Sequence, residues 1–347
     1  GTALLPIAQG AQLWVAAVNQ TGGLNGHPVK LRIYDDGADP ARHRASVQQA
    51  VEKDGAIAFL ANAEAITGQA SLDYVNDKRV PVIGMSGGEE WAYSSPLYFP
   101  QMTAGYALYK TFVYSIAGQA IAAGKRKLGT LTCVEAATCA DTDRIFAAEA
   151  KAAGMELVYR GRASLAQPDY TAECLAARNQ GAEVIMPVLD PTSISRAAAS
   201  CVRQGYRPLW GIPMQGVADS MKGDPNLAGA VASTSTFPYF QTGTPATDEF
   251  QRALRSFGGH VTLGPALSSG WTAGKLLERA GARLGEPPTS GDLLAGLWSI
   301  DRDTLGGLTI PLTFRKDEPP QRITCWFNMT ITDRTWTSPD RYGLHCL

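Results

Sequence analysis

The chain has 347 residues, of which 45% are hydrophobic and 18% are charged, and its formal net charge is −1. This length is too great for one ordinary hydrophobic core and suits two domains. Without a basic excess or a basic block to neutralise phosphates, the chain is not expected to bind nucleic acid. No stretch approaches the roughly 18 consecutive apolar residues of a membrane span. No charged and then apolar leader opens the chain, so we expect that any export signal has been removed or never existed.

The first sixty residues alternate between helix and strand patterns. Residues 1–19 predict a helix. Residues 27–36 predict a half-buried strand, because apolar and charged side chains alternate there with a period of two. Asp39 and Pro40 are typical of the N-cap and first turn of a helix, which Gly55 is expected to close.

Two short apolar runs, residues 57–60 and 80–84, are the centre of the first domain. They are separated by the helix-compatible residues 65–76, so they predict a strand, a crossover helix and a parallel strand. Each run is followed by a loop of small residues that ends in acidic residues. Ligands of open parallel sheets bind outside the carboxyl ends of the strands, so these two loops are predicted to form two walls of a binding crevice.

A second alternating series follows a predicted helix over residues 104–123. Its expected strands span 128–133, 155–159, 183–188 and 208–211, and its expected helices span 142–153, 169–179 and 190–203. Strands and helices that alternate at this spacing indicate an α/β sheet with right-handed crossovers. The remainder is predicted as a strand-like run (232–238), three helices (245–258, 265–283, 290–299) and two β-rich segments (308–313, 323–336).

Six cysteines fall in the chain as three pairs of sequence neighbours, none at metal-site spacing: Cys133 and Cys139, Cys174 and Cys201, Cys325 and Cys346. Each pair could close a local loop, and the chain-entropy model gives upper estimates of roughly 2.4, 3.6 and 3.4 kcal/mol in that order. Three disulfides would indicate an oxidising compartment. Six buried free thiols in a cytosolic protein are the alternative, because sequence alone does not fix connectivity.

Several segments resemble the leucine/isoleucine/valine-binding family of type I periplasmic binding proteins: AAVNQTGGLNG at 16–26, YDD with DP at 34–40, TGQA at 67–70 and VPVI at 80–83. The likeness covers most of the chain in order and is most specific in the first 110 residues. It implies an α/β fold of two doubly wound, Rossmann-like lobes joined by a three-strand hinge. The lobes are expected at 1–122 with 238–312 and at 123–237 with 313–347. The family begins with a central strand, and residue 1 already lies past that position.

The same resemblance implies an ABC-importer receptor that closes on a small ligand by a hinge movement. Its ligand-binding positions fall after two strands of lobe 1, near Ala63, Glu64, Ala65, Gly87, Gly88 and Glu89, and in lobe 2 near Leu189 or Asp190 and near Gln215. Ser86 of the same loop and Trp91, which could stack on a ligand, are further candidates. The implied partners are the membrane permease subunits. The protein is expected to be a monomer, without cofactor or metal, either periplasmic or lipid-anchored at the cell surface.

Three of these positions depart from the family's amino-acid site. Glu64 and Glu89 stand where donors for a ligand carboxylate are expected, and Gln215 stands where an acid for the ligand ammonium is expected. A carboxylate beside Glu64 would meet repulsion of a few kcal/mol at a partly buried effective dielectric. The ligand is therefore expected to be a neutral or cationic polar metabolite and not a simple branched-chain amino acid. Acids in the first turn of a helix also complement its dipole, which is the alternative role for these glutamates.

Two other functions stay open from the sequence. Residues 84–88 match the nucleophile-elbow pattern G-x-S-x-G, so Ser86 is a candidate hydrolase nucleophile with His260 or His345 as base. Glycines that let a ligand approach the main chain explain the same residues. A cytosolic ligand-sensing regulator of the same fold is the other alternative. The four histidines are scattered, which predicts surface or capping positions and no metal site.

Overall fold

The computed structural model describes residues 4–135 and 137–347, and the chain forms two compact units. Unit 1 comprises Gly1–Ala107 and Ser235–Ile323, and unit 2 comprises Leu108–Thr234 and Thr324–Leu347, so the chain passes between them three times. The sequence placed these crossings at 122, 237 and 312. The first crossing falls after Ala107 and not after residue 122, because helix α4 (Tyr106–Ala122) lies almost wholly in unit 2.

The sheet of unit 1 has three parallel strands in the order β1-β2-β3. These are β1 (Phe59–Asn62), β2 (Val82–Met85) and β3 (Tyr98–Phe99). The predicted parallel pair is confirmed, since Phe59 pairs with Val82 and Asn62 with Met85. Between them the chain forms a 3-10 turn, η1 (Gly68–Ser71), and a short helix, α3 (Leu72–Lys78), where one longer helix was expected.

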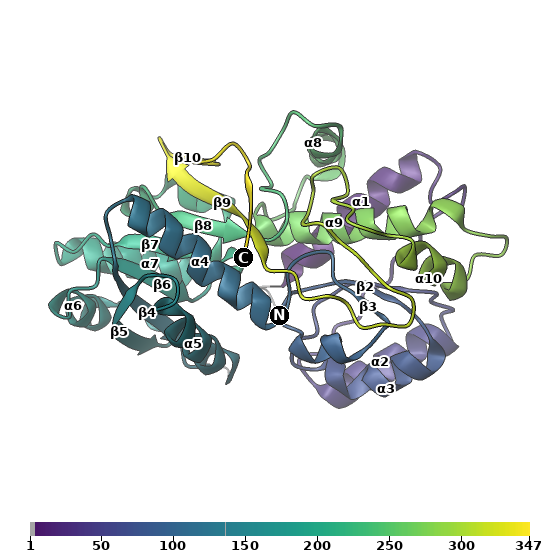
Figure 1. The fold of residues 1–347 in the computed structure, drawn as a ribbon, viewed down its shortest axis with the longest axis horizontal. Coiled ribbons are helices and arrows are strands. Elements are labelled where there is room, and N and C mark those ends of the chain that lie inside the picture. The colour runs from purple at the N-terminus through teal and green to yellow at the C-terminus, as the bar shows by residue number, and fades with distance from the viewer. Residues whose placement is uncertain (1–3, 136) are drawn as a thin grey trace. The chain divides into compact units, whose positions relative to one another are not determined.

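Helices cover both faces of this sheet, with α1 and α9 on one side and α2 and α3 on the other (Figure 1). The helices beyond α3 are α1 (Leu5–Gln20), α2 (Pro40–Glu52), α8 (Pro245–Phe257), α9 (Pro265–Ala280) and α10 (Ser290–Trp298), with 3-10 turns η2 (Glu90–Ser94) and η6 (Gly281–Arg283). Asp39 caps α2 as predicted, since its carboxylate accepts from the N–H groups of Ala41 at 2.8 Å and Arg42 at 3.0 Å.

Helices α1 and α9 pack closely because glycines lie at their crossing. A Cβ on Gly10 would lie 2.1 Å from the carbonyl oxygen of Leu267, and one on Gly270 would lie 1.9 Å from that of Ile7. Trp14 and Trp271 are fully buried beside this contact. Any side chain larger than hydrogen at either glycine would therefore force the two helices apart.

The predicted strand over residues 27–36 is wrong. In the structure residues 28–36 form no strand, and within the described part of the chain β1 pairs with β2 alone. Residues 28–36 and β1 line a cavity of about 920 Å³ without pairing with each other. Alternation gives a segment one apolar side, but a strand also needs a hydrogen-bonded neighbour. Here the segment has none, and Ile33 is 55% exposed.

Unit 2 contains an eight-stranded sheet in the order β10-β9-β8-β7-β6-β4-β5, with β11 also paired to β9. Its strands are β4 (Lys127–Cys133), β5 (Glu156–Ala163), β6 (Val184–Val188), β7 (Leu209–Ile212), β8 (Val231–Thr234), β9 (Cys325–Thr332), β10 (Thr335–Thr337) and β11 (Leu344–Cys346). Strands β4–β7 are parallel, as predicted, β8 continues the parallel series, and β9 joins β8 antiparallel. The β-rich segment at 308–313 forms no strand, only isolated bridges such as Thr309 with Thr236.

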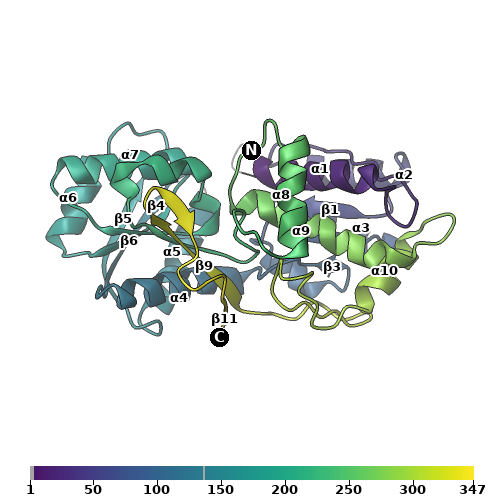
Figure 2. The same ribbon diagram turned by 90° about the horizontal axis from the view of Figure 1, so that it is seen from above.

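Helices α6 (Thr171–Asn179) and α7 (Pro191–Arg203) cover one face of this sheet, and α4 and α5 (Ala137–Ala150) cover the other (Figure 2). Short 3-10 turns follow β7: η3 (Met214–Gly216), η4 (Asp219–Gly223) and η5 (Pro225–Leu227). In the part of the chain that the structure describes, no helix is long and apolar enough to cross a membrane.

All six cysteines lie in unit 2 and form three disulfides between sequence neighbours: Cys133–Cys139, Cys174–Cys201 and Cys325–Cys346. The sequence allowed this pairing without fixing it, and the structure contains all three local loops. Cys325 and Cys346 also face each other across the β9–β11 pair, so this disulfide ties the last strand to the sheet.

Candidate functional site

The loops after β1 and β2 meet at the carboxyl end of the sheet of unit 1. Because these strands are adjacent and parallel, residues 63–65 and 86–89 come together there. The main-chain N–H of Glu64 donates to the Glu89 carboxyl group at 3.3 Å, which joins the two loops directly. The sequence-predicted contacts of lobe 1 therefore form one cluster.

Glu89 lies at the centre of this cluster and is completely buried. Its Oε1 accepts the N–H groups of Glu64 at 3.3 Å and Ser86 at 3.2 Å as well as the Ser86 hydroxyl, and its Oε2 accepts the N–H of Gly87 at 2.7 Å. Gly87 has φ +101°, a left-handed conformation that favours glycine. Burial raises the pKa of Glu89, the bond from Ser86 opposes this, and the nearby charge of Glu64 raises it further.

Glu64 is also buried, with 4% of its surface exposed. Its Oε2 pairs with Nε2 of His43, whose Nδ1 contacts the hydroxyl of Ser71 at 2.8 Å. The predicted surface or capping position of His43 is therefore wrong, because this side chain is a buried partner of Glu64. Nothing in the sequence around His43 indicated this, since the two residues lie 21 positions apart.

One oxygen of Glu64 stays unsatisfied. Its Oε1 is buried and has no hydrogen bond of good geometry with any described residue, and neither has the hydroxyl of Tyr98, although this hydroxyl interacts with the Glu64 carboxylate. Burial raises the pKa of Tyr98 well above its usual range, and the neighbouring carboxylate of Glu64 adds to this. Buried polar atoms without partners are uncommon in folded proteins and call for an explanation.

The side chains left at the surface of the cluster are small or aromatic. Ala63 is exposed, and Ala65, Gly88 and Trp91 are partly exposed. Trp91 is held by a hydrogen bond from its indole N–H to the carbonyl oxygen of Ala65 at 3.1 Å and by an edge contact with Tyr98 at 5.2 Å. The glutamates thus lie beneath a surface of alanine methyl groups, main chain and one indole ring.

The next residue, Glu90, turns away from this cluster. It accepts the N–H of Tyr106 at 2.7 Å and pairs with Arg322 at 2.5 Å, and that guanidinium lies 4.2 Å from the centre of the Tyr93 ring. The pKa of Glu90 is lowered: the bonds from Arg322 and Tyr106 outweigh the opposing effect of burial. Arg322 lies more than two hundred residues along the chain, so sequence reasoning had no means to find it.

The candidates of unit 2 lie at the carboxyl ends of its own strands. Leu189 is buried, and Asp190 caps α7 by accepting the N–H groups of Thr192 at 2.9 Å and Ser193 at 3.1 Å. Gln215 is exposed within η3. Of these three, Gln215 is the side chain that is presented to solvent.

The nucleophile-elbow geometry is incomplete. The hydroxyl of Ser86 bonds to Glu89, and no hydrogen bond joins it to a histidine among the described residues. His260 is exposed, and His345 bonds to Asp340 at 2.6 Å in unit 2. A serine hydrolase needs its base within hydrogen-bond reach of the nucleophile, so this arrangement does not support one.

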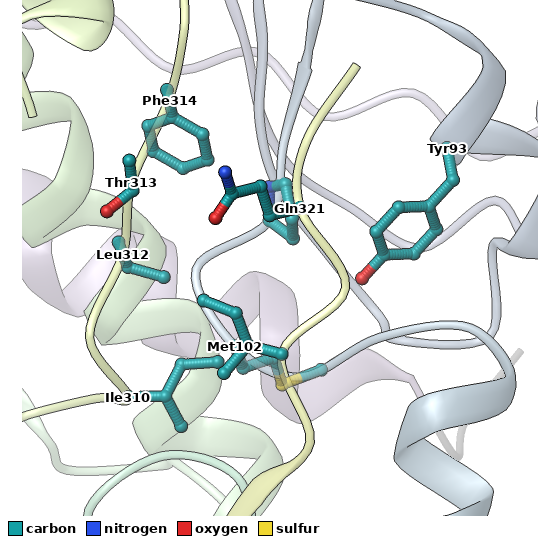
Figure 3. Close-up of a pocket in the computed structure, with 9 residues that line it drawn as sticks. Tyr93, Met102, Ile310, Leu312, Thr313, Phe314 and Gln321 are labelled. Atoms are coloured by element: carbon teal, nitrogen blue, oxygen red, sulfur yellow. The ribbon is translucent and has the colours of Figure 1, made fainter. Parts of the chain in front are cut away.

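A second cavity of unit 1 is too small for a solute. Tyr93, Met102, Leu312, Phe314 and Gln321 are among its lining residues (Figure 3), and its volume is about 10 Å³. A space of this size holds about one water molecule.

Comparison with known proteins decides the family. Residues 1–335 match the model of the family described as "Periplasmic binding protein". The chain belongs to this family. This is a family of binding proteins and not of enzymes. The sequence matches none of the curated proteins with which it was compared.

Solved structures show the same fold at low sequence identity. A branched-chain amino acid ABC transporter protein from Thermus thermophilus with bound valine has a TM-score of 0.79 and 13% identity, covering 100% of this chain and 93% of its own. A solute-binding protein from R. palustris in complex with benzoate has a TM-score of 0.75 and 13% identity, with coverages of 99% and 94%. A fatty acid ABC transporter substrate-binding protein from Thermomonospora curvata has a TM-score of 0.75 and 16% identity, covering 98% of this chain and 88% of its own.

Proposed function

We propose that this solute-binding protein captures a small neutral or cationic ligand with a flat apolar part, and not a simple branched-chain amino acid. The observation that carries this proposal is the charge of the loops after β1 and β2. Residues 62–68 and 86–94 contain Glu64, Glu89 and Glu90 but no lysine or arginine.

The two buried glutamates disfavour a ligand carboxylate at these loops. Two like charges about 4 Å apart repel by about 4 kcal/mol at an effective dielectric of about 20. Glu90 is paired with Arg322 and one oxygen of Glu64 with His43, so Oε1 of Glu64 and the carboxyl group of Glu89 carry the remaining effect. A neutral or cationic group meets no such penalty, and the partial charges of the exposed main chain suit either.

The exposed surface favours a flat apolar group. Trp91 is fixed by its bond to Ala65, so stacking a ligand ring on it costs little side-chain entropy. Ala63, Ala65 and Gly88 add little steric hindrance around it. Aromatic faces also attract cations, which agrees with the expected ligand charge.

Gln215 of unit 2 argues against an α-amino acid ligand, because a neutral amide stands where such a ligand needs an acid to pair with its α-ammonium group. The three passages of the chain between the units support capture by a hinge movement. The three disulfides support an extracytoplasmic location and argue against the cytosolic regulator. Delivery to membrane permease subunits is the partner interaction that we propose.

The ligands of the structural neighbours neither identify nor contradict this ligand. Valine and benzoate are named for two of them, and a fatty acid transporter for a third, so one fold serves unrelated ligands. Specificity must therefore be sought in the residues of this chain.

A thermal-shift screen of the purified protein against small metabolites tests the proposal. A ligand that binds only the folded state raises the melting temperature by mass action. We expect amines, amides and neutral aromatic compounds among the strongest hits. If every strong hit is an aliphatic α-amino acid, the proposed ligand class is wrong.

A further inference from the structure

Four donors converge on one carboxyl group in the cluster after β1 and β2. They are the main-chain N–H groups of Glu64, Ser86 and Gly87 and the hydroxyl of Ser86. We call these four groups the donor cradle. Converging main-chain N–H groups form anion-binding concavities, and the carboxyl group inside this one belongs to Glu89.

We propose that the donor cradle is a carboxylate-binding site that Glu89 fills from within, so that Glu89 sets ligand specificity by excluding ligand carboxylates. Three of the four donors come from the loop that carries Glu89 and one comes from the neighbouring loop, so the cradle spans both walls of the candidate site. Because Glu89 is completely buried and uses both of its oxygens, a wild-type cradle has no vacancy for a second carboxylate.

The surroundings of the cradle are those of a polar site. Glu64 Oε1 is buried next to it without a hydrogen bond, and so is the hydroxyl of Tyr98. Both atoms can bond to a small polar molecule that enters when the Glu89 side chain is removed. The cradle thus has buried polar atoms of Glu64 and Tyr98 beside it and is not sealed by apolar packing alone.

Truncation of Glu89 to alanine removes a CH₂–COO⁻ group, which has the size and charge of acetate. The four donors then lose their acceptor, while the main chain that holds three of them stays part of both loops. Acetate is therefore the matched probe for the vacated space. The inference depends on the proposed function only for its consequence, namely which ligands the wild-type protein rejects.

The test is the melting temperature of Glu89→Ala with and without sodium acetate, with sodium chloride at equal ionic strength as reference. We expect Glu89→Ala to melt lower than the wild type. Acetate at about ten times its Kd should raise its melting temperature by about 3 °C. The wild type and Glu90→Ala, which loses an exposed carboxylate outside the cradle, should not respond. A response of equal size in all three proteins, or in none, would overturn the proposal.

If Glu89→Ala does not fold, the variant Glu89→Gln tests the donor cradle instead. The amide keeps the shape of the side chain but places an NH₂ group where Gly87 or Ser86 donates, so the cradle loses an acceptor and stays filled. We expect this variant to fold, to melt below the wild type and to ignore acetate. A melting temperature equal to that of the wild type would show that the cradle does not require both carboxyl oxygens, and the proposal would fail. Neither outcome depends on the metabolite screen, so the cradle and the proposed ligand class can fail separately.

Discussion

The two units share the alternation of strand and helix, yet different interactions hold them together. Unit 2 contains all six cysteines, as three disulfides, and an eight-stranded sheet. Unit 1 contains no cysteine, has a three-stranded sheet and depends on the close crossing of α1 and α9. The buried cluster of Glu64, Glu89 and His43 also lies in unit 1. The disulfides thus lie in the unit with the eight-stranded sheet, and the buried polar cluster lies in the unit with the three-stranded sheet.

The largest expected effect concerns the helix crossing of unit 1. Gly270→Ala should destabilise the protein by about 4 kcal/mol, because the new Cβ would lie 1.9 Å from the carbonyl oxygen of Ile7 and the main chain must move. The matched control is Gly118→Ala in α4 of unit 2, where a Cβ meets nothing within 4 Å. That variant should gain about 0.5–1 kcal/mol. Urea unfolding measures both, and equal effects would refute the special role of the crossing.

The disulfides of unit 2 come next. Replacing Cys174 and Cys201 together with alanine should cost about 3.6 kcal/mol, because the unfolded chain regains the freedom of a long loop. The Cys133 and Cys139 pair closes a shorter loop and should cost about 2.4 kcal/mol when removed. Denaturant-induced unfolding of the two double variants measures both losses of unfolding free energy. The reverse order of effects would argue against loop length as the cause.

The smallest expected effect is the pH-dependent one at Glu89. Glu89→Gln should cost about 2 kcal/mol, since a buried N–H loses its acceptor. The pKa of Glu89 is raised in the folded state, so its contribution is fully present below its unfolded pKa and is lost as the pH rises through its folded pKa. The stability gap between wild type and Glu89→Gln should therefore be widest in acid and narrow on the alkaline side. Melting temperatures across pH measure it, and a gap that widens with rising pH would contradict the burial of this group.

Sequence reasoning predicted the meeting of the two loops better than it predicted the hydrogen-bond partners within them. The apolar runs at 57–60 and 80–84 predicted adjacent parallel strands, so the meeting of Glu64 and Glu89 followed from strand geometry, although residues 57–60 are only partly buried. The bond between Glu64 and His43 depends on how α2 packs on the sheet, and no local sequence pattern predicts that packing. The predicted strand at 27–36 was wrong for a related reason. Alternation of apolar and charged residues is a property of one segment, whereas a strand must also pair with a neighbouring strand.

The central claim is that the loops of Glu64 and Glu89 select against a ligand carboxylate. Titration calorimetry of the wild-type protein with benzamide, benzamidine and benzoate tests it most directly, because the three compounds share one ring and differ in the charge of one group. The account predicts that benzoate binds at least tenfold more weakly than either of the others, which corresponds to about 1.4 kcal/mol. Benzoate as the tightest binder of the three would contradict it.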